Sequence, residues 1–289
     1  MESIPNKRLA DRQKKREGDA QEREKEGSMK YPAMFDLSDK IALVTGAASG
    51  LGVAFAHAMA EAGAHVACAD INVQGLAATV AAVEQLGRKA VAIECDVTKE
   101  DEVIAMVRKT VDAFGHLDIF FNNAGISDNT NDVPKLLHEY STEWWNRVIA
   151  VDLQGAFYCA REVLKVMVQQ KSGKMINVAS VWGLSGSSAI IPVPAYCSAK
   201  GAMVNLTREL GLEYAPFGIN VNALCPGFYV TKLGGYDDPD FMKTIRAFIP
   251  MGREAQPAEL KGAAVFLASP ASDYMCGQTI VTDGGVSAK

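Results

Sequence analysis

The stretch Thr45-Gly46-Ala47-Ala48-Ser49-Gly50-Leu51-Gly52 decides the fold. An apolar run over residues 41–44 leads into it, and a helical pattern over residues 53–62 leads out of it. A strand that turns through glycines into a helix exposes unpaired backbone N–H groups at the positive end of the helix dipole, which suits a pyrophosphate. The glycines would serve a tight turn, a close approach of phosphate and the packing of helix on strand. This stretch therefore predicts a nucleotide-binding turn, with an ordinary glycine-rich loop as the alternative.

Strand-like and helix-like segments alternate along the chain beyond residue 35. The expected strands cover residues 41–44, 65–69, 90–94, 117–121, 174–179, 220–224 and 279–281. The expected helices cover residues 53–62, 73–86, 100–114, 142–170, 195–214, 239–248 and 258–267. Several strands are continuously apolar, as in parallel sheets that helices cover on both faces. The sequence therefore predicts an α/β fold with a single doubly wound parallel sheet of about seven strands and helices on both faces.

The composition argues against several classes of protein. With a net charge of −5, the chain is not expected to bind nucleic acid. No run approaches the ~20 apolar residues of a membrane span, so no membrane partner is expected either. The 6 cysteines and 4 histidines are dispersed without metal-ligand spacing. We therefore expect no metal site, and reduced thiols in a cytoplasmic protein.

The first 34 residues differ in character from the rest of the chain. A basic cluster around residues 12–16 is followed by an acidic run over residues 17–26, with almost no large apolar side chain. Such a segment buries too little surface to offset its ordering entropy. We expect a disordered extension over residues 1–34, or alternatively a partner-binding arm, and one domain with cofactor and substrate sites over residues 35–289.

Asp70 ends the second expected strand, a little over 20 residues after the first glycine of the turn. A carboxylate at this place can accept hydrogen bonds from both hydroxyls of an adenosine ribose and would repel a 2′-phosphate. The residues that follow, Ile71 and Asn72, carry no positive charge. The expected cofactor is therefore NAD. The alternative is a surface aspartate that caps the next helix.

Tyr196 and Lys200 are four residues apart, so they lie on the same face of the expected helix. A phenol has a pKa near 10 and is a poor base, but a neighbouring ammonium and an oxidised nicotinamide would stabilise its phenolate. Tyr196 could then take a proton from an alcohol. Ser180 ends an expected strand and could bind the substrate oxygen, with Ser187 and Ser188 as weaker candidates. The segment 185–194 is expected to form a wall of the substrate pocket.

From about residue 35 to residue 285 the chain resembles the short-chain dehydrogenase/reductase family. The resemblance rests on the pattern T-G-x-x-x-G-x-G, the motif Asn122-Asn123-Ala124-Gly125, Ser180, Tyr196, Lys200 and the pattern P-G-x-x-x-T over residues 226–231. It implies a Rossmann-type fold, a small alcohol or ketone as substrate, and a homotetramer. It also implies that the Asn-Asn-Ala-Gly motif braces the sheet beside the cofactor.

The resemblance assigns further contacts. Asp96 and Val97 would contact the adenine, with a helix N-cap role for Asp96 as the alternative, and residues 226–231 would hold the nicotinamide carboxamide. The full set of expected cofactor-binding residues is Gly46, Ser49, Gly50, Leu51, Gly52, Asp70, Ile71, Asp96, Val97, Asn123, Ala124, Gly125, Tyr196, Lys200, Pro226, Gly227 and Thr231. Residues 232–251 would form a mobile lid with Gly234-Gly235 as its hinge.

One departure from the family concerns the expected long helix. The family carries an asparagine in a pattern N-L-x-G that completes a proton relay with tyrosine and lysine through water. Here Asp152 stands in that place. An ionised aspartate can only accept hydrogen bonds, and its charge would favour the ammonium of Lys200 while opposing the phenolate of Tyr196. The expected catalytic residues are thus Ser180, Tyr196, Lys200 and Asp152.

These observations predict an NAD-dependent oxidoreductase that moves hydride between a secondary alcohol and the nicotinamide. The stretches 35–40 and 250–253 resemble family members that act on sugar acids and polyols. The alternatives are a 3-oxoacyl-carrier-protein reductase, or a dinucleotide-binding scaffold with poor catalysis. Apolar residues also occupy more than one face of the helix expected over residues 142–170, which suggests a subunit contact. They are Val148, Val151, Phe157, Val163 and Met167.

Overall fold

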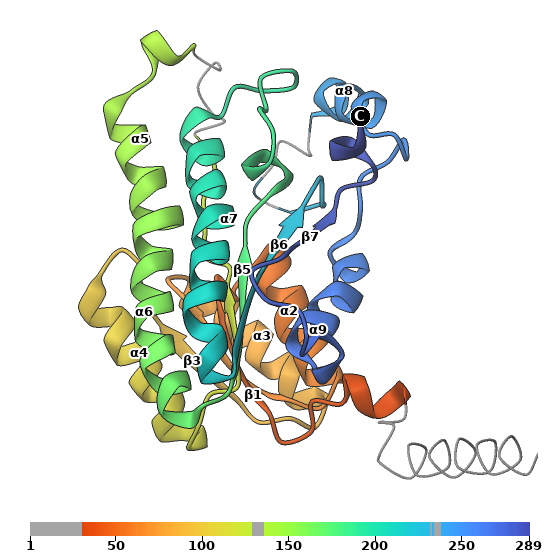
Figure 1. Ribbon diagram of the computed structural model, residues 1–289. Helices are drawn as coiled ribbons and strands as arrows, with labels where there is room; N and C mark the ends of the chain where they lie inside the picture. Colours follow the sequence, from red (N-terminus) through yellow and green to blue (C-terminus); the bar gives the residue numbers. More distant parts are fainter. Residues whose placement is uncertain (1–30, 129–135, 232, 234–237) are drawn as a thin grey trace, which may run out of the picture.

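The computed structural model describes residues 31–128, 136–231, 233 and 238–289 (Figure 1). The expected charged extension, residues 1–34, lies outside the described residues except for its end in the 3-10 helix η1, Tyr31–Phe35. The expected hinge at Gly234-Gly235 lies outside them as well.

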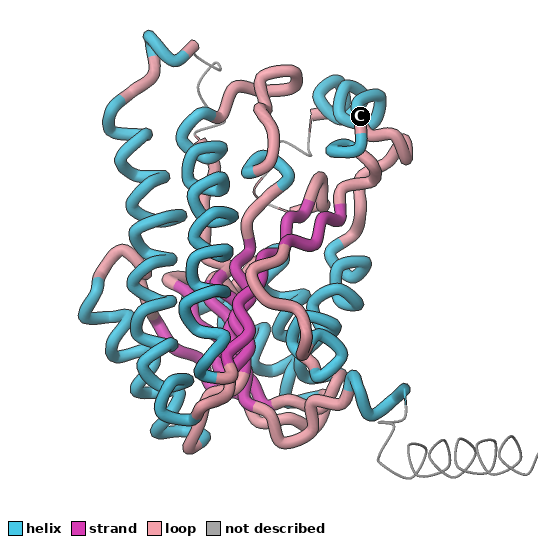
Figure 2. The backbone as a smooth tube through the Cα atoms, viewed as in Figure 1, coloured by secondary structure: helices cyan, strands magenta, loops and turns pink. Residues whose placement is uncertain are grey.

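Within the described residues, seven strands form one sheet in the order β3-β2-β1-β4-β5-β6-β7. Every neighbouring pair is parallel. Figure 2 shows the strands in magenta among the surrounding helices. The strands are β1 Ile41–Thr45, β2 His65–Asp70, β3 Ala90–Glu94, β4 Ile119–Asn122, β5 Gly173–Val178, β6 Ile219–Pro226 and β7 Thr279–Thr282. The predicted Rossmann-type, doubly wound α/β fold is confirmed.

Helices cover both faces of this sheet (Figure 1). They are α2 Gly50–Glu61, α3 Val73–Gln85, α4 Glu100–Phe114, α5 Thr142–Ile149, α6 Ala156–Gln170, α7 Pro194–Tyr214, α8 Pro239–Phe248 and α9 Lys261–Ala268. Successive residues of β1 point to opposite faces, as the pleat requires. Ala42 and Val44 pack in a core with α2, α3 and α9, whereas Leu43 packs in a second core with α4, α6 and α7. Burial on both faces explains why the strands read as unbroken apolar runs.

The helix expected over residues 142–170 is helical throughout but consists of three parts. A π-helical segment, η3 Ala150–Gly155, separates α5 from α6. Hydrophobic periodicity does not signal this change of hydrogen bonding, which is why the sequence predicted one regular helix. Such π segments occur frequently at functional sites, and this one carries Asp152.

The sequence argument for a subunit contact on this helix is weakened by the packing. Val148, Val163 and Met167 are fully buried inside the subunit. Val151 packs partly against the core beside them. Only Phe157 is exposed, at 40%. The apolar residues on several faces are therefore explained mainly by contacts within one chain.

The turn requires glycine at three of its positions, two because of their backbone conformation and one for lack of space. Gly46 and Gly50 have positive φ values of 69° and 55°, in the left-handed region that favours glycine. A Cβ on Gly52 would lie 2.0 Å from the carbonyl oxygen of Gly46. The first turn of α2 can therefore approach β1 only if residue 52 has no side chain.

We predict that Gly52→Ala lowers the free energy of unfolding by about 1–3 kcal/mol or more, because backbone must move to admit the methyl group. Gly262→Ala is the matched control, since Gly262 is also helical and nothing lies within 4 Å of its added Cβ. That control should be neutral or should stabilise the protein by about 0.5–1 kcal/mol. Chemical denaturation of both variants measures the difference. Equal stability of the two variants would contradict the packing role of Gly52.

Candidate active site

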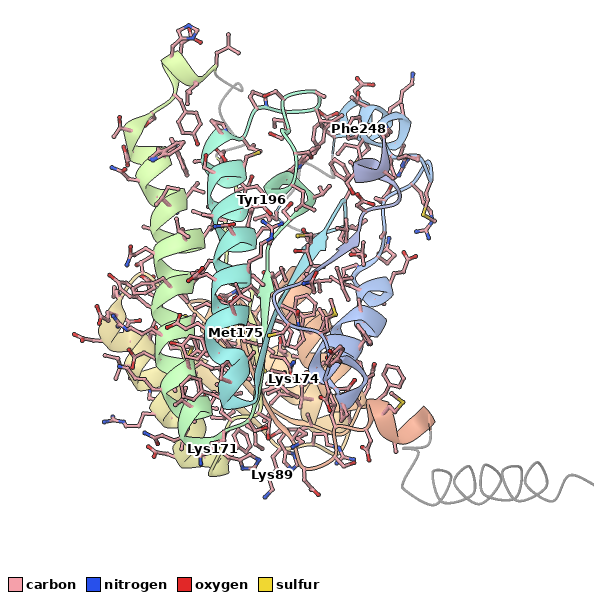
Figure 3. All side chains as sticks on the ribbon, in the orientation of Figure 1. Lys89, Lys171, Lys174, Met175, Tyr196 and Phe248 are labelled. Atoms are coloured by element: carbon pink, nitrogen blue, oxygen red, sulfur yellow. The ribbon has the colours of Figure 1, made fainter. Side chains whose placement is uncertain are left out.

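A cavity of about 800 Å³ lies along the edge of the sheet where the parallel strands end. Tyr196 is close to this edge, whereas Lys89 and Lys171 lie at the opposite edge (Figure 3). All the residues expected to bind the cofactor line the cavity, as does Ser180. Asp152 is not among the lining residues and lies behind them, 1% exposed. The carboxyl edge of such a sheet is where ligands bind.

The glycine turn and the segment after β4 pack closely at the middle of the cavity. A Cβ on Gly46 would lie 2.9 Å from Asn123 Nδ2 and 3.0 Å from Ala124 Cα. Thr45 Oγ1 accepts hydrogen bonds from the backbone N–H groups of Asn123 at 3.0 Å and Ala124 at 3.1 Å. Asn123 Nδ2 donates in return to the carbonyl of Thr45 at 2.8 Å. These contacts hold the two loops side by side at the cavity.

A second set of hydrogen bonds ties the sheet to its helices below the cavity. Asn122 Nδ2 donates to the carbonyl of Ala156 at 2.9 Å and to Asn177 Oδ1 at 3.2 Å. Asn177 Nδ2 donates to Thr207 Oγ1 at 2.9 Å. All these side chains are buried and satisfied, so β4, β5, α6 and α7 are held in one register.

Asp70 is fixed at the rim of the cavity. Its carboxylate accepts hydrogen bonds from the backbone N–H groups of Ala48 at 3.0 Å and Asn72 at 2.8 Å. The side chain that caps α3 is Asn72, which accepts from the N–H of Gly75 at 3.1 Å. Asp70 therefore does not cap α3, and the alternative role considered for it is wrong. The carboxylate oxygens keep accepting capacity for the paired hydroxyls of a ribose.

Asp96 also lacks the alternative capping role. It accepts from the backbone N–H of Thr98 at 3.0 Å and from Thr98 Oγ1 at 2.7 Å. The N-cap residue of α4 is Lys99, which makes no side-chain cap. Asp96 and Val97 thus shape the wall of the cavity after β3, next to Asp70 on the neighbouring strand.

Lys200 lies at the centre of a buried polar cluster. Its Nζ donates to the carbonyl of Val178 at 3.0 Å and forms an ion pair with Asp152 Oδ2 at 3.3 Å. The other carboxylate oxygen of Asp152 accepts from the backbone N–H of Ile126 at 2.8 Å. A Cβ on Gly125 would lie 2.9 Å from Asp152 Oδ2 and 3.2 Å from Lys200 Nζ, so a side chain there would displace the ion pair. Asp152 therefore contacts the lysine directly.

Tyr196 lies one helical turn before Lys200, whose Nζ is 5.4 Å from the centre of the phenol ring. Burial raises the pKa of Tyr196; the charge of Asp152 adds to this, while the Lys200 ammonium and a hydrogen bond with Ser180 oppose it. Burial would lower the pKa of Lys200, but the nearby Asp152 and Tyr196 raise it above its ordinary value. Burial raises the pKa of Asp152 against the attraction of Lys200. The free site therefore holds a neutral phenol beside a charged lysine.

Of the three candidate serines, the structure places one in the cavity. Ser180 is buried, and its Oγ accepts from the backbone N–H of Trp182 at 3.1 Å. Ser187 is buried away from the cavity and accepts from the N–H of Val193 at 3.3 Å, which holds its own loop together. Ser188 is exposed and does not line the cavity. Ile191 and Val193, from the segment expected to form a wall, do line it.

Sequence reasoning missed Asp128. This buried carboxylate accepts a hydrogen bond from the backbone N–H of Tyr196 at 3.0 Å, and its other oxygen accepts one from the Tyr140 hydroxyl. The N–H groups in the first turn of a helix have no partner within the helix. The N-cap residue of α7 is Val193, which cannot supply one. An apolar N-cap is thus a sequence signal for a capping group from elsewhere, although it does not say from where.

Two other features, a metal site and a membrane-spanning helix, are not found in the part of the chain that the structure describes. No group of three or more histidine, cysteine, aspartate or glutamate side chains gathers there as a metal site. Likewise, no helix among residues 31–128, 136–231, 233 and 238–289 is long and apolar enough to cross a membrane.

Comparisons with known proteins agree with this geometry. A protein-family model described as enoyl-(acyl carrier protein) reductase matches residues 46–287. The chain is 38% identical over 253 residues to cis-4-hydroxycyclohexanecarboxylate dehydrogenase of Sinomonas cyclohexanicum, covering 87% of this chain and 98% of that protein. A short-chain type dehydrogenase/reductase from Mycobacterium marinum superposes with a TM-score of 0.84 at 36% identity, covering 89% of this chain and 98% of that one. A gluconate 5-dehydrogenase from Burkholderia cenocepacia J2315, solved with NADP and tartrate, superposes with a TM-score of 0.83 at 33% identity, covering 89% and 99%.

We predict that Asp152→Asn lowers the pKa of Tyr196, because it removes a negative charge that opposes the phenolate. Ultraviolet titration of the tyrosine absorbance measures this pKa when the Tyr196→Phe spectrum is subtracted in each background. Glu213→Gln on the surface of α7 is the matched control and should leave the titration of Tyr196 unchanged. An unchanged or raised pKa in Asp152→Asn would show that Asp152 is not coupled to the phenol in this way.

Proposed function

The chain belongs to the short-chain dehydrogenase/reductase family, and we propose that it is an NAD-dependent oxidoreductase that transfers hydride between a secondary alcohol and the nicotinamide. One observation carries the proposal: Ser180, Tyr196 and Lys200 meet at one cavity whose far part is bounded by the glycine turn and Asp70. This arrangement combines a proton carrier, an electrostatic partner and a dinucleotide cradle.

The residues present fit the dinucleotide. The backbone N–H groups of the glycine turn would bind the pyrophosphate at the start of α2. Asp70 would accept from the adenosine ribose, and Asp96 and Val97 would bound the adenine. Pro226, Gly227 and Thr231 would hold the nicotinamide end, with Asn123, Ala124 and Gly125 between the two ends. When bound, NAD supplies the hydride acceptor and NADH the hydride donor.

Tyr196 would be the acid and base of the reaction. During oxidation its phenolate takes the proton of the alcohol, and during reduction its hydroxyl returns a proton to the carbonyl oxygen. Lys200 lowers the cost of the phenolate by its charge. Ser180 donates a hydrogen bond to the substrate oxygen and stabilises the charge that develops there. Asp152 holds Lys200 in place and keeps it protonated, so it acts as a positioning residue.

The remaining expectations from the sequence extend this proposal. The 3-oxoacyl-carrier-protein reductase alternative is disfavoured because Asp70 opposes the 2′-phosphate of NADP. A scaffold without catalysis is disfavoured because the catalytic set is complete.

We also propose a homotetramer, on the family resemblance and the exposed Phe157, and a reducing cytoplasmic location, in keeping with six free cysteines.

We expect Tyr196→Phe to reduce turnover of an alcohol with NAD by about 10²-fold or more, because the proton carrier is lost while the ring remains. NADH absorbance measures turnover, and a fluorescence titration with NADH should show nearly unchanged binding. Tyr274→Phe is the matched control, because Tyr274 is fully exposed and should tolerate the change. Near-normal turnover in Tyr196→Phe would remove the assigned role.

We expect kcat/KM with NAD to exceed that with NADP by at least about tenfold, because the carboxylate of Asp70 repels a 2′-phosphate. Asp70→Ala should narrow the ratio, whereas Asp112→Ala on the exposed face of α4 should not. Steady-state kinetics with both cofactors measure the ratio. Equal use of NAD and NADP by the wild type would exclude NAD preference.

A further inference from the structure

The two ends of the cavity differ in chemistry. The end formed by the segments after β2 and β3 carries the polar side chains Asp70, Asp96 and Thr98. The walls beyond Ser180 and Tyr196 are apolar and come from η4 Val181–Gly183, the loop before α7, the segment after β6, and α8. Six side chains form these walls: Trp182, Ile191, Val193, Phe228, Phe241 and Ile245. A substrate whose reacting oxygen lies between Ser180 and Tyr196 would extend into this apolar part.

The apolar walls are held in place by packing behind them. The ring centres of Trp182 and Phe228 are 5.7 Å apart with their planes at 85°, and those of Phe228 and Phe248 are 6.3 Å apart at 83°. These are the edge-to-face arrangements that aromatic pairs prefer. Trp182, Phe228 and Phe248 pack on a buried cluster that includes Met242 and Ile249. Phe248 lies on α8, at the same end of the molecule as Tyr196 (Figure 3). The aromatic side chains of the wall therefore cannot rotate away from the cavity without disrupting this buried cluster.

Hydrogen-bonding side chains are few in this part of the cavity. Among the described residues that line this part of the cavity, Ser180 and Tyr196 would both bind the reacting oxygen, which leaves the indole N–H of Trp182 and the hydroxyl of Tyr229 as further hydrogen-bonding groups. Ser127 and Arg147 also line the cavity, and the guanidinium carbon of Arg147 lies over the ring of Trp144, 5.0 Å from its centre. A polyol or sugar acid would bring several further hydroxyls against Val193, Phe228 and Ile245, where they would lose water without gaining partners.

The sequence stretches that suggested sugar acids do not reach the cavity. Residues 36–40 precede β1, at the edge of the sheet opposite its carboxyl ends. Arg253, the cation that could have met a sugar carboxylate, instead makes a two-pronged ion pair with Glu259 at 2.9 and 2.7 Å. Neither stretch contributes a lining residue. The resemblance in these stretches therefore has no contact through which it could select a substrate.

Building on the proposed function, we propose that the substrate is a secondary alcohol on an apolar ring, or the corresponding cyclic ketone, and not a polyol or sugar acid. A saturated or aromatic ring can pack against the apolar surfaces of Trp182 and Phe228 and needs no hydrogen bond beyond the one at its reacting oxygen. In the oxidation, the carbinol C–H bond breaks and its hydride reduces NAD to NADH. The O–H proton passes to Tyr196, and the carbon–oxygen single bond becomes the carbonyl, so that electrons and protons balance.

The first experiment compares two sets of substrates on the wild-type enzyme with NAD. One set holds cyclohexanol, 3-methylcyclohexanol and 1-indanol, and the other holds gluconate, sorbitol and mannitol. We expect the cyclic alcohols to exceed the polyols in kcat/KM by about 10²-fold or more, because an apolar pocket discriminates against one added hydroxyl by about 10² and a polyol adds several. Equal or better oxidation of gluconate or a polyol would overturn the substrate inference while leaving the proposed function intact. Oxidation of neither set would count against both.

A variant tests whether the apolar wall makes this selection. Ile191→Asn places an amide in the half-buried loop before α7, where the fold tolerates a polar group better than in the core. We expect it to raise the KM for cyclohexanol about tenfold with little change in the KM for NAD. Ile104→Asn, on α4 and outside the cavity, is the matched control and should change neither constant. An unchanged KM for cyclohexanol in Ile191→Asn would contradict the assigned wall.

Discussion

The buried ammonium of Lys200 is the constraint on which the rest of the site depends. A charge removed from water is tolerated only when it is paired and hydrogen-bonded, and its partners here come from distant parts of the chain. Val178 supplies a carbonyl from β5, and Asp152 supplies a carboxylate from the π-helical segment between α5 and α6. The loop after β4 closes over the pair at Gly125, where a side chain would displace the ion pair. Strand β5, the π-helical segment and the loop after β4 thus all contact or surround the charge of Lys200.

The same cluster explains how a phenol can serve as both acid and base. Tyr196 is held by the helix that carries Lys200, and its backbone N–H is fixed by Asp128 from the loop after β4. Burial and the charge of Asp152 raise the pKa of Tyr196 against the ammonium of Lys200, so the free site favours the neutral hydroxyl. The positive charge of an oxidised nicotinamide would lower the pKa of Tyr196 and so favour the phenolate.

Much of this could be predicted from the sequence, because its signals are local. The glycine turn, the apolar strands and the four-residue spacing of Tyr196 and Lys200 depend on near neighbours in the chain. Asp128 and the aromatic wall could not be predicted, because both depend on segments that only tertiary structure brings together. The π-helical segment was not predicted because the periodicity of apolar residues does not show which backbone groups are hydrogen-bonded to each other. The argument for a subunit contact is weakened at Val163 and Met167, because the periodicity of apolar residues cannot tell whether a helix of the same chain or another subunit covers a face.

The central claim is that Asp152 and Lys200 form a charged pair behind a neutral phenol. Both groups stay charged because neutralising either one alone would strand the other charge in the interior. Infrared difference spectroscopy between the wild type and Asp152→Asn at neutral pH tests this most directly. A charged pair predicts that the variant loses an ionised carboxylate band. Loss of a protonated carboxyl band instead would contradict it, because Asp152 would then be neutral and could not hold the charge of Lys200.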